Sequence, residues 1–179
     1  MPKTALIVGL LGVVWVGVAG GQTCAVRTPS TVLKLVREIC EPMGLRSALV
    51  MAVIQVESSG NPHAINIAAG RGYRVVPQSA SEAQALVDQL IKLTPDVGIG
   101  LMQVHYRYHR KRYPVTPADL LDPRTNITIG CDMLRQALRQ PGGLAQRIGR
   151  YNARSRGKRL VYAQKVLAAL NRMHHQEDF

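Results

Sequence analysis

Apolar residues recur every three or four positions over most of the chain, which is the spacing of helices that bury one face. One such stripe consists of Ile127, Cys131, Leu134 and Leu138. Ser-x-x-Glu, Thr-Pro and Asp-Pro sequences mark helix starts, and glycines mark helix ends. The predicted helices cover residues 30–43, 47–58, 79–93, 124–140, 144–151 and 159–173, with a single turn after Thr116-Pro117.

The segments between these helices carry weaker patterns. Residues 62–78 are expected to be irregular, with one short strand pair that includes Tyr73, Val75 and Val76. Thr94 begins a glycine-rich turn that continues through Gly100. The chain shows no internal repeat, linker or low-complexity segment. The pattern therefore predicts one mainly α domain with irregular loops around a cleft.

The first 22 residues have the layout of a secretory signal peptide. Lys3 precedes the uncharged, apolar stretch Ala5–Ala19, and small residues follow it. Fifteen apolar residues are fewer than the roughly 20 that span a membrane, although a retained N-terminal anchor stays open. We therefore expect a signal over residues 1–22, a domain over residues 23–179 and a periplasmic location.

Export permits disulfides, but the three cysteines are an odd number, so at least one does not pair within the chain. Cys40 and Cys131 fall on apolar stripes, and both read as core residues; a bridge between them stays open, and Cys24 precedes the first helix. Cysteine and histidine do not occur at the spacing that zinc requires, so we expect neither a metal nor another cofactor.

The formal net charge of +12 is unevenly distributed. Residues 133–176 contain no Asp or Glu, and residues 107–112 read RYHRKR. Such a surface attracts polyanions. An exported protein rarely meets nucleic acid, so anionic cell-wall polymers or lipid headgroups are the better candidates. Charge that serves only solubility is an equal alternative.

One carboxylate lies where apolar residues are expected. Val50, Val53, Ile54 and Glu57 share a helix face, and the helix then ends at Gly60 and Pro62. Burial and the negative end of the helix dipole would both raise the pKa of Glu57, which suits a general acid. Periodicity alone favours the simpler alternative, an exposed or arginine-paired Glu57 at the helix edge.

Further motifs follow in a fixed order. They are Glu57-Ser58, Asn61-Pro62-His63-Ala64, Gly100-Leu101-Met102-Gln103, Asp122-Pro123-Arg124-Thr125-Asn126-Ile127-Thr128-Ile129-Gly130 and Tyr151-Asn152-Ala153. This set, over roughly Pro29 to Gln164, resembles the catalytic domain of soluble lytic transglycosylases, a lysozyme-like (goose-type) helical fold with a substrate cleft. The long 79–93 segment resembles members associated with type IV secretion and conjugation systems.

The resemblance implies a peptidoglycan lytic transglycosylase that cleaves the β-1,4 bond between N-acetylmuramic acid and N-acetylglucosamine and leaves a 1,6-anhydro sugar. Glu57 would be the catalytic acid and then the base. Tyr151 would contact Glu57 or the sugar. The other implied substrate contacts are Ser58, Met102, Gln103 and Asn152. Packing is the alternative role for Tyr151 and Met102, and a helix-end role is the alternative for Ser58.

Two other functions stay open. A hydrolytic lysozyme needs a second carboxylate, for which Asp96 is the candidate. A weakly active or non-catalytic module would use its basic half to bind cell wall or apparatus proteins. The implied partners are glycan strands and secretion or conjugation proteins, with a monomer expected. Arg150 and Arg154 replace small residues around Tyr-Asn-Ala and should add positive charge near the cleft.

Overall fold

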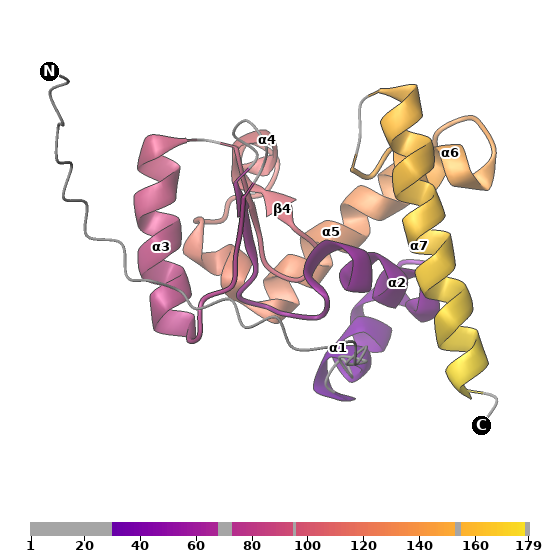
Figure 1. The fold of residues 1–179 in the computed structure, drawn as a ribbon, viewed down its shortest axis with the longest axis horizontal. Coiled ribbons are helices and arrows are strands. Elements are labelled where there is room, and N and C mark those ends of the chain that lie inside the picture. The colour runs from indigo at the N-terminus through magenta and orange to yellow at the C-terminus, as the bar shows by residue number, and fades with distance from the viewer. Residues whose placement is uncertain (1–29, 68–72, 95, 153–154, 178–179) are drawn as a thin grey trace, which may run out of the picture.

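The computed structural model describes residues 30–67, 73–94, 96–152 and 155–177 (Figure 1). Within these ranges the helices are α1 (Ser30–Cys40), α2 (Ser47–Ser58), α3 (Ala80–Leu93), α4 (Tyr106–His109), the 3-10 helix η1 (Ala118–Leu121), α5 (Pro123–Leu138), α6 (Leu144–Gly149) and α7 (Arg156–Glu177). The strands are β1 (Ile65–Ile67), β2 (Tyr73–Val75), β3 (Val97–Ile99) and β4 (Val104–His105).

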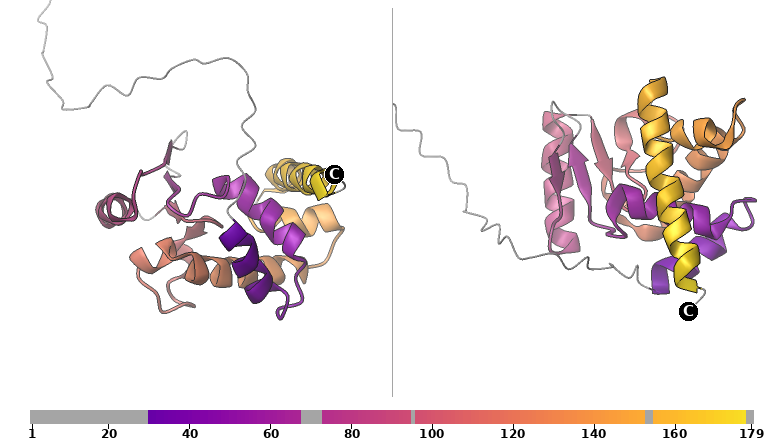
Figure 2. Two further views of the ribbon diagram at one scale, coloured as in Figure 1. Left: turned by 90° about the horizontal axis from the view of Figure 1, so that it is seen from below. Right: turned by 45° about the vertical axis from the view of Figure 1, so that its right-hand side comes forward.

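Helix α2 is the centre of the larger, helical lobe. Its residues 50–54 are all buried, because α1 packs on one side of it and α7 on another. Figure 2 shows α7 running along this lobe at the opposite end of the molecule from α3. A helix that is apolar nearly all round belongs in a core. The single-face pattern read from the sequence therefore described only part of the burial of α2.

The smaller lobe contains a four-stranded antiparallel sheet in the order β2-β1-β3-β4. A separate apolar cluster, which includes Ile65, Val87 and Leu120, joins this sheet to α3 and η1. Helix α5 contributes Ile129 to this cluster and Ile127 to the core of the helical lobe. Helix α5 thus connects the two cores, and its two apolar faces hold the lobes together.

The mainly α prediction is confirmed, and the predicted helices are present with shifted ends. Helix α1 ends at Cys40 rather than Met43, and α7 runs from Arg156 to Glu177 rather than from Arg159 to Met173. The loop prediction was wrong in part, since residues 97–99 of the expected glycine-rich turn form a strand. Residues 104–105 form a further strand and residues 106–109 a helical turn, for which the sequence indicated no element. Strands of two or three residues are too short to show an alternating pattern in sequence.

Side-chain caps begin the helices where the sequence indicated them. Ser79 Oγ accepts a hydrogen bond from the Glu82 amide at 3.1 Å, and Asp122 Oδ1 accepts one from the Thr125 amide at 2.8 Å. The carboxylate of Glu82 accepts from the Gln78 amide at 2.8 Å. In a complete capping box the Glu82 side chain would accept a hydrogen bond from the Ser79 amide. Here it accepts from the amide of the preceding residue, Gln78.

A buried asparagine on α5 fixes the loop between β3 and β4, residues 100–103. Asn126 accepts from the Met102 amide at 2.8 Å and donates to the carbonyls of Ile99 and Leu120 at 2.8 and 2.7 Å. Gly100 has φ +78°, and a Cβ there would lie 2.4 Å from Asn126 Nδ2. The glycine and asparagine of two distant motifs are therefore parts of one packed contact.

Cys40 and Cys131 are both buried free thiols, so they form no bridge in this structure. Burial raises the pKa of Cys40 to about 11 and that of Cys131 to about 12. Cys24 and the predicted signal over residues 1–22 lie outside the described residues. Among the described helices, none is long and apolar enough to cross a membrane.

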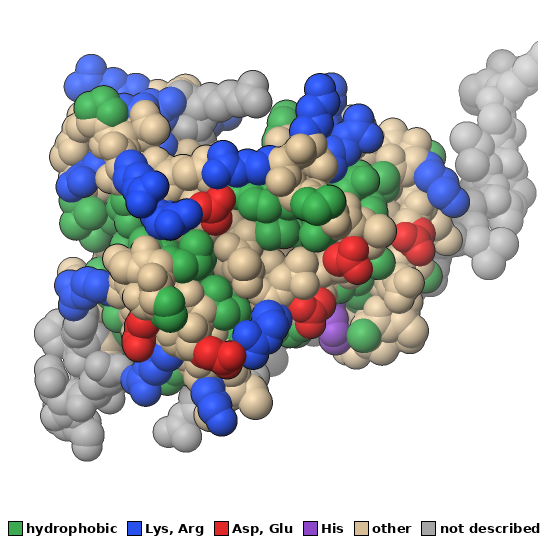
Figure 3. Space-filling view, turned by 180° about the vertical axis from the view of Figure 1, so that it is seen from behind, with side chains coloured by type: hydrophobic (Ala, Val, Ile, Leu, Met, Phe, Trp, Pro, Cys, Tyr) green, Lys and Arg blue, Asp and Glu red, His purple; other side chains and the backbone are tan. Residues whose placement is uncertain are grey.

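Positive charge is prominent on the rear face of the molecule (Figure 3). Figure 3 shows Lys and Arg side chains gathered over both upper projections of the rear face, while most Asp and Glu side chains lie lower. Some of these charges are paired: Asp132 accepts from Arg112 at 3.2 Å and from Arg135 at 2.7 Å. The basic segment 107–112 thus serves partly to hold α4 and its following turn on α5.

Candidate functional site

The end of α2 is built by three consecutive small residues after Glu57. Ser58 Oγ donates to the Ile54 carbonyl at 3.1 Å and accepts from the Gly60 amide at 3.2 Å. Ser59 ends the helix with φ 56°, in the left-handed region that costs a residue with a side chain about 1 kcal/mol. The chain turns away directly after the carboxylate, which leaves Glu57 in the last turn of α2.

Glu57 is 6% exposed and receives two side-chain hydrogen bonds from the described part of the chain. Tyr162 Oη on α7 donates to Glu57 Oε1 at 2.7 Å, and Asn152 Nδ2 in the loop after α6 donates to the same oxygen at 3.1 Å. Both bonds from the described residues fall on Oε1, so the proton of a neutral carboxyl is expected on Oε2. The contacts come from residues 95 and 105 positions away in the chain.

Burial raises the pKa of Glu57 from 4.5 to about 7. The hydrogen bonds from Tyr162 and Asn152 and the positive charge of Arg74 on β2 oppose this shift, because they favour the charged form. The carboxyl is consequently balanced between its neutral and charged forms near pH 7. A group that both donates and accepts a proton works best with such a pKa.

This raised pKa should make the stability of the protein depend on pH. Between pH 4.5 and about 7 the folded protein holds a proton on Glu57 that the unfolded chain has released. The free energy of unfolding therefore falls as pH rises through this window, by roughly 3 kcal/mol in all. Glu57→Gln has no proton to lose, so urea unfolding should show the variant gaining stability over the wild type as pH rises. An unchanging difference across the window would contradict the assignment.

A cavity of about 420 Å³ opens beside Glu57. Its walls come from the end of α2, from Asn152 and from one face of α7. On α7 the lining residues Lys158, Val161, Tyr162 and Lys165 follow at positions i, i+3, i+4 and i+7, so they share one helix face. The cavity therefore combines a neutral or charged carboxyl with amide, phenol and ammonium donors.

Three of the residues that the resemblance implied as substrate contacts hold the structure behind the cavity. Met102 is fully buried in the core of the helical lobe, as the packing alternative expects, and its contact with the glycan stays a prediction. Gln103 Nε2 donates to the carbonyls of Ala64 and Gly100 at 2.9 and 2.8 Å, and its backbone has φ 50°. Ser58 is 1% exposed and serves the end of α2.

Tyr151 was expected to contact Glu57 or the sugar. Its hydroxyl makes no hydrogen bond to Glu57. It donates instead to the Met102 carbonyl at 2.7 Å, and the ring stacks on Tyr162 at a centroid distance of 6.3 Å. The phenol that reaches Glu57 belongs to Tyr162, which the sequence reading missed. A tyrosine on an apolar stripe with Ala163, Val166 and Ala169 needs a buried partner, and that signal could have pointed to it.

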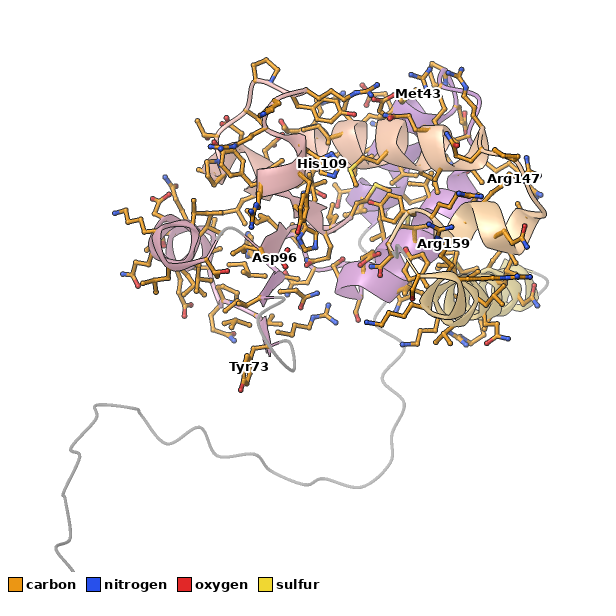
Figure 4. The ribbon with its side chains drawn as sticks, turned by 90° about the horizontal axis from the view of Figure 1, so that it is seen from above. Met43, Tyr73, Asp96, His109, Arg147 and Arg159 are labelled. Carbon is orange, nitrogen blue, oxygen red and sulfur yellow. The ribbon has the colours of Figure 1, made fainter. Side chains whose placement is uncertain are left out.

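Asp96, the candidate second carboxylate, is engaged elsewhere. Its Oδ1 lies 3.1 Å from His105 Nδ1, and Asp96 is not among the described residues that line the cavity. Figure 4 shows Asp96 on the sheet side of the molecule, with Arg147 and Arg159 on the opposite side, at α6 and α7. The Asp96–His105 pair anchors the loop before β3 to β4.

Of the two arginines around the Tyr-Asn-Ala motif, Arg150 is not among the described residues that line the cavity. Arg150 donates to the Pro141 carbonyl at 3.2 Å, in the loop before α6, and Arg154 lies outside the described residues. Among the described residues, the cations that line the cavity are Lys158 and Lys165. Among the described residues no group of three or more His, Cys, Asp or Glu is placed to hold a metal ion.

Comparison with known proteins gives a family match and several curated relatives. The sequence model of the family described as "Transglycosylase SLT domain" matches residues 34–166. Curated relatives named "Type IV secretion system protein virB1" from Brucella abortus biovar 1 and Brucella suis biovar 1 are 35% identical over 89 residues. That alignment covers 50% of this chain and only 37% of each relative. No solved structure matches the chain.

Proposed function

This chain belongs to the transglycosylase SLT domain family, and on that premise we propose that it is a peptidoglycan lytic transglycosylase with Glu57 as its acid and base. The observation that carries the proposal is one carboxyl, 6% exposed with a pKa of about 7, at the wall of an open cavity. Such a group is costly to bury, and the fold supplies two donors to hold it in place.

The reaction that we propose needs one carboxyl. Neutral Glu57 donates its proton to the glycosidic oxygen between N-acetylmuramic acid and N-acetylglucosamine, and the bond from that oxygen to C1 of muramic acid breaks. The Glu57 carboxylate then takes the proton of the muramic C6 hydroxyl, whose oxygen bonds to C1. Glu57 ends protonated, no water is consumed, and the intramolecular attack benefits from proximity.

The positions of the carboxylates favour this reaction over hydrolysis. A hydrolase needs a second carboxyl that serves as nucleophile or activates a water at about 5–9.5 Å from the acid. The candidate for that role, Asp96, is bonded to His105 and is not part of the cavity wall formed by the described residues. A reaction in which Glu57 works alone fits this arrangement.

Product analysis tests the proposed reaction. Purified peptidoglycan digested by the protein should release muropeptides with 1,6-anhydro ends, each lighter by one water than the hydrolysis product in mass spectrometry. Reducing ends alone would replace the proposal by a lysozyme. No release from peptidoglycan, together with retained biological function in the Glu57→Gln variant, would favour a non-catalytic wall-binding module.

Tyr162→Phe should alter the pH profile as well as the rate. Loss of the 2.7 Å bond removes a group that favours the charged form, so the pKa of Glu57 rises further. The pH at which activity falls on the alkaline side should move up by about one unit, and the rate should drop roughly tenfold because the acid is less well oriented. The measurement is the rate of anhydro-product formation between pH 5 and about 9.

Tyr151→Phe is the matched control. Its hydroxyl bonds the Met102 carbonyl rather than Glu57, so this variant should lose stability without moving the alkaline limb. Equal shifts in both variants would show that the tyrosines act on packing alone.

The similarity to VirB1 proteins bears on the biological setting. We propose that this protein, exported by its N-terminal segment, opens the periplasmic cell wall locally for a secretion or conjugation apparatus. The relatives named as type IV secretion proteins support this setting, although the alignment covers only part of them. Loss of substrate transfer in a strain that carries Glu57→Gln, with normal growth, would test it.

A further inference from the structure

We infer that Lys158 and Lys165 form a binding site for the carboxylate groups of the peptide stem on muramic acid, so that the enzyme discriminates between stem-bearing and bare glycan strands. The inference rests on the proposed function and adds a substrate specificity to it. It concerns the two lysines on the α7 wall of the cavity, which the proposed acid–base chemistry does not use.

The two lysines stand on either side of the catalytic contact. Tyr162, which donates to Glu57, lies between them on the same face of α7, and all three line the cavity. Residues i and i+7 on a helix are separated by about 10 Å along its axis. Both lysines are exposed, so their ammonium groups stand in water on the rim while Tyr162 is buried beneath them.

The lysines bring positive charge to the wall of the cavity that holds the acid. Cations near Glu57 favour its ionised form, and Arg74 on β2 already does so from the sheet side. A cavity wall that served only proton donation would do better with neutral side chains there. Charge that serves only solubility could stand on any exposed face of α7, whereas these two lysines line the cavity, where an anionic ligand can pair with them.

The chemistry of the strand supplies such a ligand. The sugars are neutral N-acetyl hexoses, which call for hydrogen-bond donors and apolar surface rather than ammonium groups. Negative charge enters the strand through the peptide attached to the lactyl group of muramic acid, which carries free carboxylates. Muramic acid is also the sugar whose C1 must lie beside Glu57, so its peptide is attached to a sugar that sits in the cavity lined by Lys158 and Lys165. We therefore expect ion pairs between the ammonium groups of the two lysines and the carboxylates of the peptide.

The test compares two substrates in the full chain. Rates of anhydro-product formation, as kcat/KM, are measured on soluble glycan strands with intact stems and on strands stripped of peptide by an amidase. The wild type should prefer the stem-bearing strands, and in Lys158→Gln/Lys165→Gln this preference should fall about three- to tenfold, since exposed ion pairs are individually weak. Added salt of about 0.5 M should reduce the wild-type preference in the same way.

Two control proteins make the result specific. Lys92→Gln makes the same change at an exposed lysine on α3, at the other end of the molecule, and should keep the wild-type preference. Lys158→Arg/Lys165→Arg keeps the charge and should keep most of the preference. An unchanged preference in the double Gln variant, or an equal loss on both substrates, would overturn the inference.

A binding measurement separates this inference from the proposed function. In a Glu57→Gln background, which cannot turn over substrate, binding of stem-bearing strands should weaken three- to tenfold when both lysines become Gln. If the wild type cleaves neither substrate, the proposed function fails, whereas binding that ignores the lysines contradicts only the present inference.

Discussion

Glu57→Gln should lower the rate of anhydro-product formation by about a thousandfold or more. Glutamine has nearly the shape of glutamic acid, so it can still receive the hydrogen bonds of Tyr162 and Asn152 on its carbonyl oxygen. It cannot donate an acidic proton or take one back. The loss of rate thus comes from chemistry and not from a disturbed fold.

The measurement is the release of anhydromuropeptides from purified peptidoglycan near pH 6, where wild-type Glu57 is mostly protonated. A Glu41→Gln variant, which changes an exposed carboxylate in the turn after α1, is the control and should retain full activity. Turnover above about a tenth of the wild-type rate in Glu57→Gln would remove Glu57 from the catalytic role.

Asn126→Ala should destabilise the protein by about 3–5 kcal/mol. Three buried backbone groups, the Met102 amide and the carbonyls of Ile99 and Leu120, lose their partner together, and each unpaired group costs about 1–3 kcal/mol. Replacement by aspartate would keep the acceptor for Met102 but lose both donated bonds. Thermal unfolding should show a fall in Tm of roughly 10 °C for Asn126→Ala.

Thr128→Ala is the matched control for this experiment. Thr128 lies on the same helix, is exposed and bonds only within its own turn, to the Arg124 carbonyl at 2.8 Å. Its replacement should change the free energy of unfolding by less than about 0.5 kcal/mol. If Asn126→Ala behaves like Thr128→Ala, the loop between β3 and β4 is held by other contacts.

Many local features of this protein could be predicted from its sequence. Helix stripes, the caps at Ser79 and Asp122, and the position of Glu57 on an apolar face depend on residues close together in the chain. For that reason the helices were predictable, whereas periodicity alone favoured an exposed or arginine-paired Glu57. The ordered motifs pointed to the family because motif order is a property of the chain.

Only the tertiary structure decided which side chains meet. It gave Glu57 the phenol of Tyr162 where the sequence pointed to Tyr151, and it placed Met102 in the core. It built a sheet from strands too short to show a period, and it set Lys158 and Lys165 on the cavity wall. Contacts between residues about 100 positions apart depend on how α2 and α7 pack, and packing leaves no local pattern in the sequence.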